Sequence, residues 1–276
     1  MARKSIFGRS RWKHFKEHIS ILISEALLIL RDKTDLPEDE KLLNRKLHSC
    51  FAEANYKLGL DYMPAFDAKN SPDPHDKQKA KREDNIPDLS WNIINHADNP
   101  EHCNRNFALE CKRLGQPTSR SWILNEQYVK EGILRFLLDK EGYGKGCESG
   151  AMVGYVQNMA FDDILQEINT HINLRGVSVP LLTKPTTDWQ HQGVSCFDHA
   201  LVRSFAPSLF SLKHFWVDLR DHYRPSSPHS SAEIRNEILD EEGMKEPTDK
   251  VSIREQTVET SLEEWHQLQL PIDRLD

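Results

Sequence analysis

Long hydrophobic runs and paired cysteines are both missing from this 276-residue chain. No apolar run reaches the roughly 18 residues of a membrane-spanning helix, and residues 1–6 contain no apolar stretch of the signal-peptide type. The five cysteines are scattered and form no Cys-x-x-Cys pair, which is typical of reduced thiols rather than of disulfides or a structural zinc site. We therefore expect a soluble, cytoplasmic protein without membrane contact.

Motifs of nucleotide hydrolysis and of several hydrolase classes are also absent. The chain has no Gly-x-x-x-x-Gly-Lys-Ser/Thr loop, no Gly-x-Gly-x-x-Gly after a strand, no Gly-x-Ser-x-Gly and no His-Glu-x-x-His. The stretch Gly142–Gly150 contains Gly-Tyr-Gly-Lys-Gly, but the Lys-Ser/Thr pair that opens a helix is missing from it. A glycine-rich turn is predicted there, and ATP hydrolysis by this chain is not expected.

Charge is distributed unevenly along the chain. The net charge is −7, but residues 229–276 carry 13 acidic and 5 basic side chains, whereas residues 1–228 carry 30 and 31. Residues 1–16 hold six basic side chains and no acidic one, which permits a phosphate-contacting arm, although a solvated helix start is the more ordinary interpretation. The acidic tail, residues 223–276, is expected to be helical or disordered and to serve as an interaction segment.

Apolar periodicity predicts an α/β protein with a mixed central sheet flanked by helices. Helical spacing is found at residues 10–31, 38–58, 122–139 and 161–172, and strand-like runs lie at 86–95, 106–114, 151–156, 195–204 and 211–219. Gly59 is predicted to end the second helix, and the hydroxyls of 118–121 to cap the third. The organisation expected is an N-terminal helical extension (1–39), a core (40–222) containing a polar loop (64–85), and the acidic tail (223–276).

Two charges stand two residues apart on one of the predicted strands. Side chains at i and i+2 of a strand point to the same face, so Glu110 and Lys112 are expected side by side, with Cys111 facing the other way. A carboxylate and an amine seldom share an apolar strand without a functional reason. Asp88 opens the preceding strand-like run, 22 residues earlier, and this gap suits a hairpin.

The pairs Pro87-Asp88 and Glu110-Cys-Lys112 resemble the two elements of the PD-(D/E)xK, or restriction-endonuclease-like, nuclease superfamily. The resemblance covers residues 86–156, about a quarter to a third of the chain. The pattern [Asp/Glu]-x-Lys also occurs at 39–41 and at 67–69, within a helix start and a polar loop. Only the Glu110 match lies in an apolar run after a Pro-Asp strand, so its context carries the signal.

The resemblance implies a catalytic set of Asp88, Glu110 and Lys112, joined by Glu53 from the preceding helix. Mg²⁺ (or Mn²⁺) would be held by Asp88, Glu110 and the backbone carbonyl of Cys111, because these hard cations prefer oxygen ligands and take few protein carboxylates. Lys112 would lie near the attacking water or the scissile phosphate, where it stabilises charge or helps deprotonation.

Further residues are expected to contact the nucleic acid. Gln127, Tyr128 and Lys130 lie in the helix that follows the Glu-x-Lys strand, where nucleases of this type often add polar groups, and Arg113 directly follows Lys112. The resemblance thus implies a Mg²⁺-dependent endonuclease acting on DNA, of the kind found as effectors in bacterial anti-phage defence. The expected partners are DNA and either an ATPase- or helicase-type protein or a second copy of the chain. A catalytically inactive nuclease-fold module and an RNA-directed nuclease are the alternatives.

A second set of polar residues lies late in the chain. It comprises Asp198, His199, Arg203, His214 and Asp218. His214 and Asp218 share a predicted strand face, but four residues of strand span about 13 Å, which is too far for one metal ion. Polar residues satisfied at sheet edges are the expected outcome. A His-based general-base site, or phosphate contacts from Arg203, Lys213 or His214, is the alternative.

Overall fold

The computed structural model describes residues 4–69, 85–94, 104–119, 121–138, 142–144, 146–175, 179–184 and 193–223. All of them belong to one compact unit, Met1–Arg224. Most of the predicted polar loop 64–85 and nearly all of the predicted acidic tail 223–276 lie outside the described residues. The fold and the candidate site are therefore those of the unit that precedes the tail.

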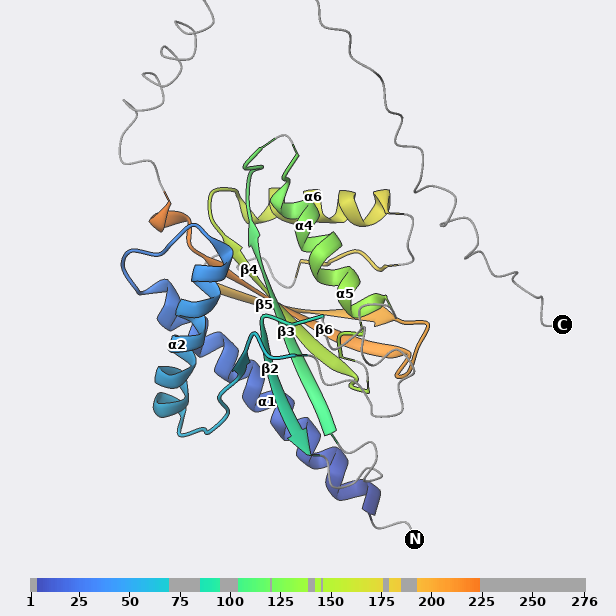
Figure 1. The fold of residues 1–276 in the computed structure, drawn as a ribbon. Helices are drawn as coiled ribbons and strands as arrows, with labels where there is room; N and C mark the ends of the chain where they lie inside the picture. Colours follow the sequence, from blue (N-terminus) through green and yellow to red (C-terminus); the bar gives the residue numbers. More distant parts are fainter. Residues whose placement is uncertain are drawn as a thin grey trace, which may run out of the picture. The chain divides into compact units, whose positions relative to one another are not determined.

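Within the described residues, the strands form a six-stranded mixed sheet in the order β1-β2-β3-β4-β6-β5 (Figure 1). Their bounds are β1 (Ala65–Phe66), β2 (Leu89–Ile94), β3 (Asn104–Leu114), β4 (Ser149–Val156), β5 (Val194–Val202) and β6 (Leu209–Asp218). β2 pairs antiparallel with β1 and β3, β4 runs parallel to both β3 and β6, and β5 pairs antiparallel with β6. The predicted α/β class with a mixed sheet is confirmed.

Helices cover both faces of this sheet (Figure 1). Their bounds are α1 (Lys4–Arg31), α2 (Glu40–Leu58), α4 (Leu124–Tyr128), the π-helical turn η2 (Val129–Ile133), α5 (Leu134–Leu137), α6 (Phe161–Leu174) and the 3-10 turn η3 (Arg220–His222). α1 and α2 share one apolar cluster with the sheet, and α4, η2, α5 and α6 share another. None of the helices in the described ranges combines the length and the apolar character needed to cross a membrane.

The ends of two helices show where local sequence signals succeed and fail. Asp39 caps α2, because its carboxylate accepts the N–H of Leu42 at 2.9 Å, and Gly59 ends α2 in the left-handed conformation at φ 62°, as predicted. The predicted hydroxyl cap of the next helix is wrong. α4 begins after Ile123, which makes no side-chain capping bond, so burial of its apolar residues, rather than a cap, positions this helix.

Alternate residues of β3 face different helix layers. Phe107, Leu109 and Cys111 pack in the apolar cluster of α1 and α2, whereas Ala108 and Leu114 pack in the cluster of α4–α6. Glu110 and Lys112 alternate with the first group and therefore share the α4–α6 side, where they are only 1% and 8% exposed. The strand thus places two charged groups inside the protein.

Candidate active site

β3 continues beyond its pairing with β2. Carboxylate side chains accept the backbone N–H groups of β3 that this pairing leaves free. The pairing ends at Leu109, so among the described residues no strand lies beside the segment that follows on that side. The N–H of Cys111 donates to Asp88 Oδ2 at 2.7 Å, and the N–H of Arg113 donates to Glu40 Oε2 at 3.1 Å. Asp88, just before β2, and Glu40, the first residue of α2, are therefore held at this edge by the backbone itself.

The ammonium group of Lys112 lies among four oxygen atoms. Its Nζ is 2.8 Å from Glu110 Oε1 and 2.8 Å from the carbonyl oxygen of Cys111. Glu40 Oε1 is 3.0 Å away and Asp88 Oδ2 is 3.9 Å away. The structure thus brings the predicted residues Asp88, Glu110 and Lys112 together, and adds Glu40 as a third carboxylate.

Arg135 of α5 is a second cation at the site, which the sequence did not reveal. Its Nη1 lies 3.0 Å from Glu110 Oε1 and 3.1 Å from the hydroxyl of Tyr143. Glu110 Oε1 therefore accepts from both Lys112 and Arg135, while the buried Glu110 Oε2 has no hydrogen-bond partner in the described part of the chain. A buried carboxylate oxygen without a donor is costly, so this atom is poised to accept a ligand or a cation.

The pKa values at this site reflect burial first and the neighbouring charges second. Burial, and then the neighbouring Glu110, raise the pKa of Asp88 to about 8 even though Lys112 opposes the shift. Burial alone would lower the pKa of Lys112, but Glu110, Asp88 and Glu40 together hold it above its ordinary value. Three carboxyl groups thus lie beside the two cationic side chains Lys112 and Arg135, and they favour the protonated form of Lys112.

The oxygen atoms at this edge are of the type that hard divalent cations prefer as ligands. In the ranges that the structure describes, no group of three or more His, Cys, Asp or Glu side chains is arranged to hold a metal ion. The candidate donor set is narrower: the carboxylates of Asp88 and Glu110 with the carbonyl oxygen of Cys111. Mg²⁺ characteristically uses one or two protein carboxylates and keeps several waters. The partnerless Glu110 Oε2 fits such a cation.

Glu53 does not reach the site. It lies on α2, 13 residues after Glu40, which is about 20 Å along a helix, and its Oε1 is 2.6 Å from Lys33 Nζ. Glu40 is the acidic residue that α2 contributes instead. Glu40 is the middle residue of the [Asp/Glu]-x-Lys match at 39–41, which the sequence pattern alone identified only as a helix start.

The residues predicted to contact nucleic acid lie in different environments. Tyr128 is fully buried, and its hydroxyl lies 2.6 Å from His214 Nδ1, so its predicted contact with nucleic acid is wrong. The helix packs this side chain into the α4–α6 cluster because its neighbours there are apolar. Lys130 is exposed and Gln127 is partly exposed. Arg113 is partly exposed and donates to the carbonyl oxygen two residues before α2, at 3.1 Å.

Tyr128 begins a buried chain of directed hydrogen bonds. His199 Nε2 lies 2.8 Å from the carbonyl oxygen of Pro180, which can only accept, so this nitrogen carries the proton. His199 Nδ1 must then accept from His214 Nε2 at 3.3 Å, and His214 Nδ1 accepts from the Tyr128 hydroxyl. Trp216 Nε1 donates to the same hydroxyl at 3.0 Å. Burial lowers the pKa of both imidazoles, in agreement with two neutral rings.

The rest of the late polar set is paired within the protein. Arg203 is 3% exposed and donates to backbone carbonyl oxygens at 2.8 to 3.4 Å. Asp218 lies 2.7 Å from Arg220, and Asp198 lies 2.8 Å from Lys213. The expectation of satisfied polar residues is confirmed for these positions, and neither Arg203 nor His214 is placed to contact a phosphate.

Comparison of the chain with models of known families, with curated proteins and with solved structures gave no significant match. The function must therefore be inferred from the geometry and chemistry of the residues themselves. The group formed by Asp88, Glu110, Lys112, Glu40 and Arg135 is the strongest candidate, because it combines buried charge, a partnerless acceptor and access from solvent through the 21% exposed Asp88 side chain.

Proposed function

We propose that this protein is a divalent-cation-dependent endonuclease with a restriction-endonuclease-like core that hydrolyses DNA phosphodiester bonds. The observation that carries the proposal is the convergence of Asp88, which directly precedes β2, and Glu110 of β3 on the Lys112 ammonium. The hairpin is followed by the helical segment α4–α5 and then by the parallel strand β4, which supports the nuclease-like arrangement.

The chemistry proposed for the site divides into two roles. A Mg²⁺ or Mn²⁺ ion bound by Asp88, Glu110 and the Cys111 carbonyl oxygen would polarise a phosphoryl oxygen and make water a stronger nucleophile. Lys112, whose ammonium lies among the carboxylate oxygen atoms, would donate hydrogen bonds to the charge that develops on the phosphate. Charge stabilisation is therefore the role proposed for Lys112, with help in deprotonating the water as the alternative.

Arg135 and Glu40 are positioning residues in this proposal. Arg135 binds Glu110 Oε1 at 3.0 Å and so leaves Oε2 as the free acceptor of this carboxylate. Glu40 holds Lys112 Nζ at 3.0 Å through one carboxylate oxygen and the backbone of β3 through the other. Each fixes the orientation of a reacting group through a charged hydrogen bond.

Incubation of supercoiled plasmid with the full chain and Mg²⁺ or Mn²⁺ tests the proposal. Cleavage is expected in the wild type, and it should be lost with EDTA, with Glu110→Ala and with Lys112→Ala. Lys33→Ala removes an exposed lysine that also pairs with a glutamate and serves as the matched control. Cleavage retained by Glu110→Ala or Lys112→Ala would contradict the assignment. Single-stranded RNA and tRNA, offered in parallel, distinguish the RNA-directed alternative.

The proposed partners are those that could supply the DNA specificity that the chain's own motifs do not explain. The sequence contains no recognisable module for reading DNA sequence, so we propose that specificity comes from a protein partner, of ATPase or helicase type, or from a second copy of the chain. An effector role in bacterial anti-phage defence would suit such an arrangement. Co-purification of a nucleotide-hydrolysing protein with the tagged chain, or a dimer in sedimentation equilibrium, tests these two options.

One observation favours the alternative of an inactive nuclease-fold module. Lys112 Nζ already lies among the oxygen atoms, and Asp88 and Glu40 already accept backbone N–H groups of β3. Such a cluster can close a strand edge without a metal ion. Calorimetric titration with Mn²⁺ separates the two functions, since the nuclease requires binding that disappears in Glu110→Ala, whereas the inactive module requires neither binding nor cleavage.

A further inference from the structure

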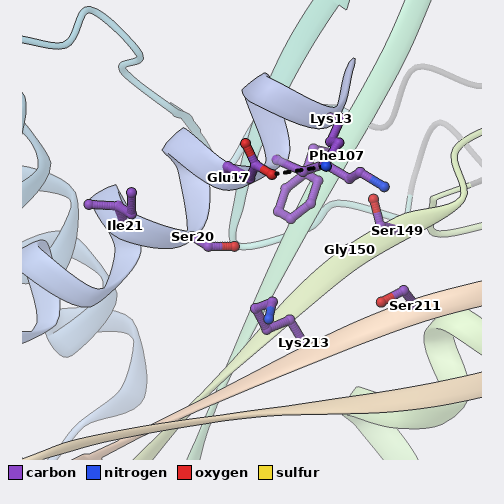
Figure 2. A pocket seen from close by; sticks show the side chains of 10 residues that line it. Lys13, Glu17, Ser20, Ile21, Phe107, Ser149, Gly150, Ser211 and Lys213 are labelled. Atoms are coloured by element: carbon purple, nitrogen blue, oxygen red, sulfur yellow. Dashed lines mark ion pairs between the residues drawn. The ribbon is translucent and has the colours of Figure 1, made fainter. Parts of the chain in front are cut away.

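A separate cavity lies on the opposite face of the sheet. It has a volume of about 370 Å³ and is lined by α1 and by the N-terminal halves of β3, β4 and β6 (Figure 2). Phe107, which lines it, belongs to the apolar cluster of α1 and α2, whereas Glu110 points to the α4–α6 side. The cavity therefore shares no residue with the candidate nuclease site.

Three lysines, three serines and one glutamate supply the polar lining of this cavity. They are Lys13, Lys16, Glu17 and Ser20 from α1, Ser149 from β4, and Ser211 and Lys213 from β6. Ser149 and Ser211 are paired across β4 and β6, which places their hydroxyls next to each other on one face. Figure 2 shows these strand residues opposite Lys13 and Ser20 across the cavity. Ammonium and hydroxyl groups gathered around one hollow are donors suited to an anion.

The ion pairs at this cavity are weak enough to be exchanged for a ligand. Each lysine has one carboxylate partner whose side chain is at least half exposed: Lys16 with Glu148 at 3.0 Å, Lys213 with Asp198 at 2.8 Å and Lys13 with Glu17 at 3.9 Å. Exposed pairs of this kind contribute little to stability. The lysines can therefore turn to an anion while the carboxylates turn to water.

Ser149 provides an independent observation. The residue is 5% exposed, and its buried Oγ has no hydrogen-bond partner in the described part of the chain. A buried hydroxyl without a partner is costly, and this one lines the cavity. A rotation of this side chain toward the space between α1 and the strands would give the hydroxyl a partner in a bound ligand.

We propose that this cavity binds a small phosphorylated molecule of mononucleotide size, with its phosphate contacted by Lys16, Lys213 and Ser149. The volume falls at the lower end of small-molecule sites, which span about 300–1,000 Å³, and it is too small for a duplex. Ile21 and Phe107 supply an apolar wall for the rest of the ligand. The site is independent of the proposed nuclease activity, so either assignment can fail without the other.

Calorimetric titration of the full chain with inorganic phosphate and with adenosine monophosphate tests this site. Because hydrogen bonds to charged groups contribute about 1.5–3 kcal/mol, Lys213→Met, Lys16→Met and Ser149→Ala should each weaken binding about tenfold or more. Glu148→Gln removes the competitor of Lys16 and should tighten binding about twofold to fivefold. Lys184→Met breaks a similar exposed ion pair, with Asp162, on the other face of the sheet. This control should leave the binding affinity unchanged.

The outcomes separate the possible sources of the phosphate. Binding of adenosine monophosphate with the stated pattern of losses and gain supports the proposal. The proposal is overturned if neither phosphate nor the mononucleotide binds at millimolar concentration. It is also overturned if Lys184→Met loses as much binding affinity as Lys213→Met, or if only a single-stranded oligonucleotide binds through the lysines. The Lys→Met substitutions keep the apolar stem of the side chain, so they test the proposed anion site even if Ser149→Ala fails to fold. Binding unchanged in Glu110→Ala confirms that the two sites are distinct.

Discussion

Two polar clusters lie on the same side of the sheet and are built in opposite ways. Glu110 and His214 occupy one row across β3, β4 and β6, with Met152 between them. Around Glu110 the groups are charged, partly accessible, and leave Glu110 Oε2 without a partner in the described residues. Around His214 the groups are neutral and buried, and their hydrogen bonds run in one direction, from the Tyr128 hydroxyl to the Pro180 carbonyl oxygen. The difference supports our proposal that the Glu110 cluster is functional and the His214 cluster structural, because a ligand would relieve the cost of the partnerless buried Glu110 oxygen atom.

The largest expected effect separates the clusters by activity. Glu110→Gln and Lys112→Met should each reduce Mg²⁺-dependent plasmid cleavage by at least about 10²-fold, the usual cost of removing a group that stabilises transition-state charge. Tyr128→Phe should leave the rate within about twofold, since the hydroxyl that it removes bonds His214 and Trp216 and not the charged cluster. An equal loss in Tyr128→Phe, measured at matched folded fraction, would remove the functional distinction between the clusters.

One substitution in each cluster should change the stability of the fold in opposite directions. Tyr128→Phe should lower the free energy of unfolding by about 1–3 kcal/mol, because His214 Nδ1 and Trp216 Nε1 lose their buried partner. Asp88→Asn should raise it, because the buried carboxylate beside Glu110 is disfavoured, as its raised pKa records. Urea unfolding followed by circular dichroism measures both. A less stable Asp88→Asn protein would show that the charged cluster holds the fold together.

A smaller effect tests which acidic residue of α2 belongs to the charged cluster. Glu40→Gln should reduce cleavage about tenfold, which corresponds to one charged hydrogen bond to Lys112. Glu53→Gln should cleave like the wild type, since Glu53 pairs with the exposed Lys33. The two substitutions are chemically identical and lie on the same helix. The reverse result would mean that the sequence-based choice of Glu53 was right.

The pH dependence of stability should also differ in sign. His199 and His214 have lowered pKa values, so their contribution is present above the ordinary value of 6.5 and is lost as the pH falls below it. Asp88 has a pKa raised from 3.8 to about 8, so its contribution is lost as the pH rises through this interval. The stabilisation by Asp88→Asn should therefore grow from about pH 6 to about pH 8, and urea titrations at both values measure it. An equal stabilisation by Asp88→Asn at both pH values would contradict the raised pKa of Asp88.

Local patterns predicted the elements that carry the site and one feature of its geometry. The period of two in β3 put Glu110 and Lys112 on one face, and the spacing to Asp88 predicted the hairpin that brings them together. Gly59 marked the end of α2 because glycine adopts the left-handed C-cap conformation without a steric penalty. The hydroxyl cap proposed at 118–121 failed because packing of α4 against the sheet outweighs a capping bond.

The sequence by itself determined the α/β pattern, the strand faces and the chemical identity of the Asp88, Glu110 and Lys112 group. Only the tertiary structure decided its remaining members, because Glu40 meets Lys112 across 72 residues and Arg135 meets Glu110 from another layer. Burial of Tyr128, likewise, depends on how its helix packs. Hydrophobic periodicity reports which face of an element is buried, but not which distant helix end meets an unpaired strand edge, since that depends on long-range packing.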